Sequence, residues 1–476
     1  TIYRLIYLTY FCSRTTVIKN YKLRKFNFMN FKPIILSLTI WLLGHWFAEA
    51  QAQQPSFSLE ESVNYALENN AEARNARLEI QAAKGLIGER TSEGLPQITS
   101  RLNATKNLKV PISPFPAQFF DPEAPEGTFI GIQFSPIYSA NLTATVSQMI
   151  FNGSYFIGLK AAKTYKQLVE FDKEFTDLEV VENVKKAYFS VLVSEERETL
   201  IQANLNRLDT LLKETEILYE EGFAEKIDVT RIRVQNNNIR TELNKAKTST
   251  SVSKALLKLQ MGFPEEEEIV LTDKLDDFTQ YLETQRLLNE EGQQRVEVDQ
   301  INTNYDLAVL DLKNNQIQYM PRLDANYTFQ RNAFGGNFSK LWSGDWYTGS
   351  ILGITLEIPI FDGFLKMHKI QQNRVQMRQL EVQKEFTLQN IQLEKFQARQ
   401  NLINSLQELE VQEENRDLAL EVFNMAKIKY QEGVGSNLEV VEADATLKEA
   451  ETNYFSALYD TFIARVDLEK ALGILK

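Results

Sequence analysis

The sequence predicts a mainly α-helical protein with a membrane β-barrel portion, built from two copies of one unit. Three observations lead to this fold class. Four segments alternate apolar and polar residues over a length that can cross a bilayer, two helical stretches (154–220 and 364–431) are exceptionally long, and a series of landmarks recurs in the same order after about 211 residues. We therefore expect strands from several copies to form the barrel, and the helices to continue it as a long coiled-coil tube.

The first part of the chain has the features of an export signal. From Met29 onward, a basic residue (Lys32) precedes an apolar run over 33–47 and then small residues. This order is typical of a secretory signal peptide, which we expect over 29–52. A short membrane anchor is the alternative. Residues 1–28 show no domain-like pattern, and we expect them to be a non-native upstream segment.

Composition excludes several classes of function. The net charge is −12 for the chain and −18 without residues 1–52, so we expect no nucleic-acid partner. Beyond residue 52 the chain has no cysteine and one histidine, His368. It therefore lacks the residues for a His/Cys metal site and for the usual nucleophile–base pairs. We expect no enzyme activity, no metal and no cofactor.

The internal repeat defines the expected domains. The segment Tyr219–Val229 resembles Tyr430–Val440, and Gly262 occupies the same place in the order as Gly473. Two unrelated helical stretches that share turn chemistry are the alternative. We expect a first repeat over 53–262, a second over 287–476, and between them an acidic, solvated linker over 263–286.

Each repeat is expected to run as helix, strand, loop, strand, long helix, turn, helix. The first helices are expected over about 58–92 and 287–318. Ser58 and Glu61 have the spacing of a capping box at the start of the former. The helices that return from the turns, at about 227–261 and 438–472, are half as long as those that precede them.

The strand segments have one apolar and one polar face. Their apolar series are Ile98, Ser100, Leu102 and Ala104; Leu142, Ala144 and Val146; Leu323, Ala325, Tyr327 and Phe329; and Leu352, Ile354, Leu356 and Ile358. Such alternation suits a sheet between lipid and water, although a soluble antiparallel sheet is the alternative. Four strands cannot close a barrel, and an open edge is not tolerated in lipid. Three copies would supply twelve strands, so we expect a homotrimer.

The long helices extend far beyond a bilayer. At 1.5 Å per residue each would measure about 100 Å. Apolar residues at spacings of three and four, including Val181, Val184, Tyr188 and Val191, form a coiled-coil seam.

Together these features resemble the TolC-like outer membrane efflux proteins, over nearly all of 56–475. The two helix-turn-helix motifs, Tyr219–Val229 and Tyr430–Val440, carry the resemblance most specifically. The resemblance implies a trimer in the outer membrane with a periplasmic extension. It further implies contacts with outer-membrane lipid, a periplasmic adaptor protein and, indirectly or at the tips, an inner-membrane pump.

The resemblance also implies roles for individual residues. Gly222 and Gly433 match the glycines of the periplasmic tip turns. Glu439 and Glu442 match paired acidic residues that face the pore, where three copies would form two carboxylate rings that favour cations. A solvated helix face is the simpler interpretation of these two glutamates.

Two further residues match contacts that close the family's pore, namely Asp228 and Tyr430. Well-known members carry an arginine where this chain has Gly435. The ion-pair part of the lock is therefore expected to differ, with Lys226 or Glu225 as possible substitutes.

The function that the resemblance implies is passive conduction of small molecules through an exit duct of a tripartite efflux system. Two alternatives remain open: a duct for type I protein secretion, and a periplasmic coiled-coil scaffold without a pore.

Overall fold

The computed structural model describes residues 55–278 and 285–476, which belong to one unit. The expected signal peptide (29–52) and upstream segment (1–28) lie outside the described residues. Within the described ranges, none of the helices combines the length and apolar character needed to cross a membrane.

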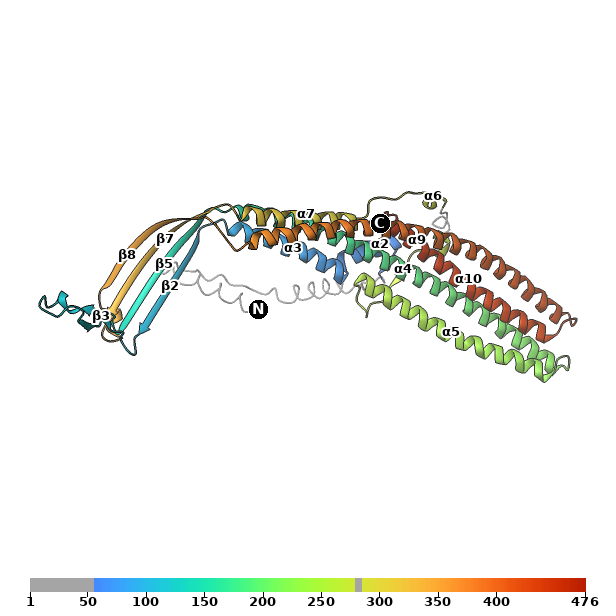
Figure 1. Cartoon of the computed structure of the whole chain (residues 1–476). Coiled ribbons are helices and arrows are strands. Elements are labelled where there is room, and N and C mark those ends of the chain that lie inside the picture. The colour runs from blue at the N-terminus through green and yellow to red at the C-terminus, as the bar shows by residue number, and fades with distance from the viewer. Residues whose placement is uncertain (1–54, 279–284) are drawn as a thin grey trace, which may run out of the picture. The chain divides into compact units, whose positions relative to one another are not determined.

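Four long antiparallel strands form one sheet in the order β2-β5-β7-β8 (Figure 1). They are β2 (Gln97–Lys106), β5 (Tyr138–Phe151), β7 (Arg322–Gly335) and β8 (Trp346–Glu357). The loop between β2 and β5 contains a small hairpin, β3 (Ser113–Pro116) and β4 (Phe129–Ile132), with the 3-10 turn η1 (Ala117–Phe119) between them. A single-turn helix, α8 (Lys340–Ser343), lies between β7 and β8.

The strand register places the four predicted apolar series on the same face. Ile98 lies opposite Val146, Val146 opposite Tyr327, and Tyr327 opposite Leu352. On the other face, Thr99, Thr145, Thr328 and Ile351 form the neighbouring row. Because side chains alternate along a strand, one register fixes both faces at once. The alternation predicted from the sequence is confirmed.

Two long helices follow the two strand pairs, as predicted. Helix α4 (Gly153–Glu220) has 68 residues and α9 (Leu365–Gln431) has 67. The Asn152 side chain caps α4 by accepting a hydrogen bond from the Ser154 N–H at 3.0 Å. Each long helix turns into a shorter one, α5 (Lys226–Met261) or α10 (Asn437–Ala471).

The helix expected over 58–92 is broken into two in the structure. Helix α2 (Leu59–Asn69) ends at Asn70, and α3 (Ala71–Ser92) begins there. Asn70 caps α3 through the Glu72 N–H at 2.7 Å, and its own amide donates to the Gln260 carbonyl at 2.7 Å. The end of α5 therefore packs against the break, where Gly262 lies close to the backbone of Asn69.

The corresponding helix of the second half is shorter than the expected 287–318. Helix α7 spans Val296–Ile317, and the four-residue α6 (Gln285–Leu288) precedes it. The Gln293 N–H donates to the Leu472 carbonyl at 2.7 Å, so the end of α10 meets the chain just before α7. This contact holds residues before α7 in a non-helical conformation.

The acidic linker is only partly a solvated segment. Strand β6 (Val270–Leu271) pairs in parallel with β1 (Ser56–Phe57), and the 3-10 turn η2 spans Leu275–Phe278. Asp273 accepts hydrogen bonds from the Leu59 N–H at 2.8 Å and the Tyr188 hydroxyl at 2.9 Å. This carboxylate thus caps α2 and satisfies a buried tyrosine.

Buried apolar residues form two main clusters along the helices. One joins the middle of α4 to α2, α5 and the second half of α10, and includes Val184, Leu257 and Phe462. The other lies between the α4–α5 and α9–α10 hairpins and includes Leu208, Ile232, Phe423 and Leu447. The second cluster holds the two hairpins side by side (Figure 1).

Candidate functional site

Two equivalent turns end the helical hairpins. Gly222 and Gly433 have φ of 84° and 73°, the left-handed conformation that favours glycine. The Phe223 N–H reaches back to the Leu218 carbonyl at 2.7 Å, and the Val434 N–H reaches back to the Lys429 carbonyl at 3.0 Å. These are the bonds of a Schellman helix end. The two predicted tip glycines therefore have the same local role.

The hairpin ends contact each other within one chain. The Gln431 side chain of α9 donates a hydrogen bond to Glu214 of α4 at 3.1 Å. The sequence motifs thus lie at the ends of neighbouring hairpins.

Asp228, one of the two predicted gate residues, takes part in the start of α5. Its carboxylate accepts a hydrogen bond from the Glu225 N–H at 3.2 Å and lies 3.8 Å from the Arg231 guanidinium. Within one chain, Asp228 therefore stabilises the first turn of its own helix. Its contact with a neighbouring hairpin stays a prediction.

Tyr430, the other predicted gate residue, packs against the cluster between the hairpins. Its hydroxyl oxygen is buried without a hydrogen-bond partner among the described residues, as are both amide atoms of Asn437. Leaving such groups unpaired costs about 1–3 kcal/mol each. The turn between α9 and α10 is therefore flanked by three buried polar atoms without a hydrogen-bond partner among the described residues.

Gly435 has a local structural reason to be glycine. A Cβ atom at this position would lie 2.8 Å from the Lys429 Cβ and 3.1 Å from the Lys429 carbonyl carbon. The Gly435 N–H also donates to the Lys429 carbonyl at 3.0 Å. In this turn a larger residue would require the backbone to shift. The predicted substitutes, Lys226 and Glu225, are exposed on the other tip.

The two predicted pore carboxylates lie on the exposed side of α10. Glu439 and Glu442 are both exposed, whereas Val440 and Ala443 are buried against the rest of the chain. Ser436 caps the helix by accepting a hydrogen bond from the Glu439 N–H at 3.3 Å. The first turns of α10 therefore direct both carboxylates away from their own chain, as a ring between copies would require.

A second pair of carboxylates on α10 was not among the predicted site residues. Asp444 and Glu451 are buried, with 4% and 7% of their surface exposed. Together with Asn437 they follow one another at intervals of seven residues, which places all three on the seam. This spacing is the signal by which the sequence could have revealed them.

The polar face of the sheet carries hydrogen-bonding side chains. Asn141 bonds to Asn332 across β5 and β7, and Thr145 lies 3.4 Å from Thr328 between their hydroxyl oxygens. Arg101 of β2 lies on this same face, in register with Thr143. A surface of this kind suits contact with water.

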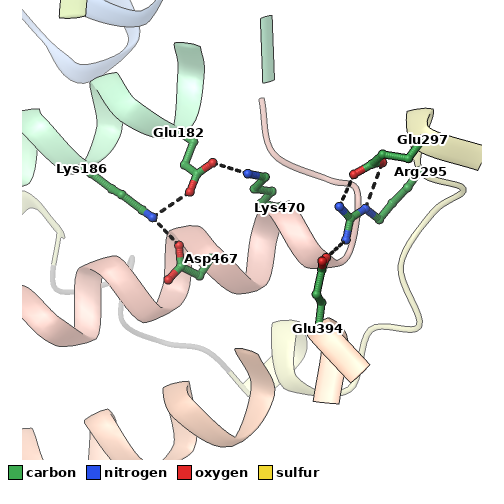
Figure 2. Close-up of polar contacts among 7 residues, drawn as sticks. All are labelled: Glu182, Lys186, Arg295, Glu297, Glu394, Asp467 and Lys470. Atoms are coloured by element: carbon green, nitrogen blue, oxygen red, sulfur yellow. Dashed lines mark hydrogen bonds and ion pairs between the residues drawn. The ribbon is translucent and has the colours of Figure 1, made fainter. Parts of the chain in front are cut away.

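Ion pairs connect the long helices to their neighbours near the C-terminal end of α10 (Figure 2). Glu182 of α4 accepts hydrogen bonds from Lys186 at 2.7 Å and from Lys470 of α10 at 2.6 Å, and Lys186 also pairs with Asp467 at 2.6 Å. Arg295 bridges Glu297 of α7 and Glu394 of α9. These contacts connect α4 with α10, and α7 with α9.

The Glu182 carboxylate illustrates how these pairs work. Burial by itself would raise the pKa of Glu182, but the hydrogen bonds from Lys186 and Lys470 outweigh burial and lower the pKa below its usual value. Glu182 is therefore held as a carboxylate.

Comparison with known proteins decides the family. The sequence profile of the outer membrane efflux protein family matches residues 63–262 and 281–474. The chain belongs to this family. The protein is accordingly an outer-membrane efflux channel component rather than an enzyme, as predicted.

Individual relatives are distant but cover most of the chain. The outer membrane protein TolC of Vibrio cholerae is 22% identical over 431 residues, covering 88% of this chain and 91% of the relative. Among solved structures, CusC has a TM-score of 0.66 at 16% identity, covering 90% of this chain and 95% of its own. The open-state MtrE channel of Neisseria gonorrhoeae has a TM-score of 0.63 at 17% identity, covering 88% and 89%. The TolC-like fold predicted from the sequence is confirmed.

Proposed function

We propose that three copies of this chain form an outer-membrane exit duct of a tripartite efflux system, which passively conducts small molecules from the periplasm to the exterior. The observation that carries the proposal is the four-stranded sheet with one apolar face and two outer strands, β2 and β8, each paired on one side only. In lipid such edges need partners, and copies of the same chain can supply them.

The helices support the same assembly. Val382, Phe386 and Phe396 of α9 are more than half exposed in the single chain, at 65%, 54% and 61%. Large exposed apolar residues on one helix favour burial against another protein surface. A neighbouring copy of the chain would cover them and close the helices into a tube.

The repeat assignment belongs to the same proposal. We propose that 53–262 and 287–476 are two copies of one unit, joined by 263–286. In support, Gly262 and Gly473 follow the shorter helices with nearly equal φ of 70° and 71°. Each of these helix ends also accepts a hydrogen bond from a residue that precedes a 22-residue helix. Asn70, before α3, donates to the Gln260 carbonyl, and Gln293, before α7, donates to the Leu472 carbonyl.

The tips supply the proposed gate and the contact with other proteins. Gly222 and Gly433 allow the compact turns, and a periplasmic adaptor protein would dock around them. Glu439 and Glu442 would form two rings of three carboxylates in the trimer, favouring cations near the entrance. An inner-membrane pump would provide the energy, because the duct itself only conducts.

A liposome assay tests the proposal. The purified protein is inserted into vesicles loaded with a small cationic dye and with a folded protein too large for a closed tip. We expect slow release of the dye and retention of the protein. Vesicles that retain both cargoes, although protease protection shows that the strands have inserted, would contradict the duct.

A further inference from the structure

Two buried carboxyl groups lie where the α9–α10 hairpin meets the α4–α5 hairpin. Asp444 and Glu451 project from α10 into the interface with α4 and α5, two helical turns apart. The ion pairs found in the described part of the chain include neither of them. Buried carboxyl groups without a cation are uncommon, because removing a carboxylate from water is costly.

Each carboxyl group is instead held by a neutral amide from the α4–α5 hairpin. The Gln235 side chain of α5 donates a hydrogen bond to Asp444 at 2.8 Å. The Asn204 side chain of α4 donates to Glu451 at 2.7 Å. The partner residues differ, but both bonds cross from one hairpin to the other.

Nearby cations are already engaged. Arg207 of α4 bonds to the Asn204 oxygen and lies over the Phe423 ring, with 4.8 Å from the guanidinium carbon to the ring centroid. Lys448 of α10 pairs with Glu242 of α5.

Two further arginines near these carboxyl groups also contact other acidic residues. Arg197 of α4 lies 3.9 Å from Glu242, and Arg416 of α9 bonds to Asp417 at 2.8 Å. These groups moderate the field at the interface without forming an ion pair with Asp444 or Glu451.

Burial raises the pKa of both carboxyl groups, and the amide hydrogen bonds and the nearby cations Arg207, Lys448 and Arg416 offset only part of that effect. A carboxyl group whose pKa is higher when buried than when exposed favours the buried state at acidic pH. As the pH rises through the raised pKa, ionisation increasingly opposes burial. Contact between the hairpins is therefore tightest below about pH 4, the usual carboxyl value, and weakens above it.

We propose that Asp444 and Glu451, as neutral carboxyl groups, dock the α9–α10 hairpin onto α4 and α5, and that their ionisation eases release of this hairpin. The inference rests on the proposed duct, whose gate we place at the hairpin tips. It assigns a positioning role to two residues outside the tip turns. It predicts a duct that closes more firmly as its surroundings acidify.

The test compares the open probability of single channels in planar bilayers at about pH 4, the usual carboxyl pKa, and at about pH 8, far above it. In the unmodified protein we expect the open probability to rise with pH, because ionisation of the two buried carboxyl groups opposes docking of the hairpin. The doubly neutral variant Asp444→Asn/Glu451→Gln keeps both hydrogen-bond acceptors and cannot ionise. We expect it to stay mostly closed, with less than about a twofold change over the same range.

A matched control changes the exposed carboxylates of the same helix. Glu439→Gln/Glu442→Gln should alter ion selectivity and retain the pH-dependent opening. An equal pH dependence in the unmodified protein and in Asp444→Asn/Glu451→Gln would overturn the inference, while leaving the duct in place.

Hydrogen exchange provides a readout that does not depend on conduction. Amide protection in α10, corrected for intrinsic exchange, should fall as the pH rises in the unmodified protein and stay constant in the doubly neutral variant. If no channels open at any pH but this difference persists, the duct proposal fails and the docking role stands. If α10 protection is the same in both proteins at every pH, the docking role is wrong. The single variants Asp444→Asn and Glu451→Gln replace the double variant in both measurements if it does not fold.

Discussion

Phe189 of α4 stacks face to face on Phe462 of α10, with ring centroids 4.4 Å apart and an interplanar angle of 1°. Both side chains are almost fully buried. The stack joins the long helix of the first half to the short helix of the second half. It therefore anchors the helical portion independently of the tips, where the hairpins are proposed to move.

Replacing this ring should destabilise the helical portion. Phe462→Ala is expected to cost about 3–5 kcal/mol, because it removes a buried aromatic and leaves a cavity. Thermal loss of helical circular dichroism measures the effect. Phe396→Ala is the comparison, because Phe396 is 61% exposed in the single chain and would be covered only by a neighbouring copy in the proposed trimer. A larger loss from Phe396→Ala would show that contacts between copies outweigh this core.

The Glu182 ion pairs should give the opposite pH dependence to Asp444 and Glu451. Because the pKa of Glu182 is lowered in the folded chain, its contribution is present above the usual carboxyl pKa of about 4.3 and is lost as the pH falls further. Glu182→Gln should lower stability by about 1–3 kcal/mol at pH 7 and remove this acid-dependent loss.

Thermal denaturation at pH 7 and at about pH 3, well below the usual value, checks that prediction. Glu170→Gln serves as a control, because Glu170 pairs with Lys166 on an exposed surface of the same helix, where such pairs contribute about 0–1 kcal/mol. Equal stability of the unmodified protein and Glu182→Gln at pH 7 would contradict the role of the pair.

Glycine substitutions should have opposite signs at the tip and within the helix. Gly222→Ala places a side chain on a residue in the left-handed conformation. This costs about 1 kcal/mol, although the added Cβ atom would point into open space. Gly158→Ala in α4 also meets open space, but in a helical conformation, and should stabilise by about 0.5–1 kcal/mol. Hydrogen exchange at each site distinguishes the two; protection of the tip that increases in Gly222→Ala would refute the assignment.

Adjacent residues on β8 test which face of the sheet meets lipid. Leu352 lies on the apolar face and Ile351 on the polar face. Leu352→Lys should weaken the inserted protein by about 2–4 kcal/mol near the bilayer midplane, whereas Ile351→Lys should be tolerated. The yield of protease-resistant protein in vesicles measures insertion. If Ile351→Lys reduced insertion more than Leu352→Lys, the assignment of the two faces to lipid and water would have to be reversed.

Much of this fold could be predicted from the sequence because its elements are long and strictly periodic. The alternation around Ile98 and Leu352 defines the strands, and the glycines at 222 and 433 define where the long helices turn. The break at Asn70 could not be predicted, because its cause is the distant Gln260 carbonyl. The pairing of β1 with β6 likewise depends on segments more than 200 residues apart.

The candidate site was predicted less completely. The exposure of Glu439 and Glu442 agrees with the place that the resemblance implies, and their assembly into rings stays a prediction. The burial of Asp444 and Glu451 was not predicted, because charged residues on a helix usually face solvent. Their heptad spacing indicates a place on the seam, but their partners Gln235 and Asn204 are known only from the structure.

The most direct test of the duct is the ion selectivity of single channels in planar bilayers, for the unmodified protein and for Glu439→Ala/Glu442→Ala. The proposed function predicts a small, cation-selective conductance that trivalent cations block, and loss of that block in the variant. An inserted protein that conducts no ions at any voltage, at any pH from about 4 to about 8, would contradict the central claim.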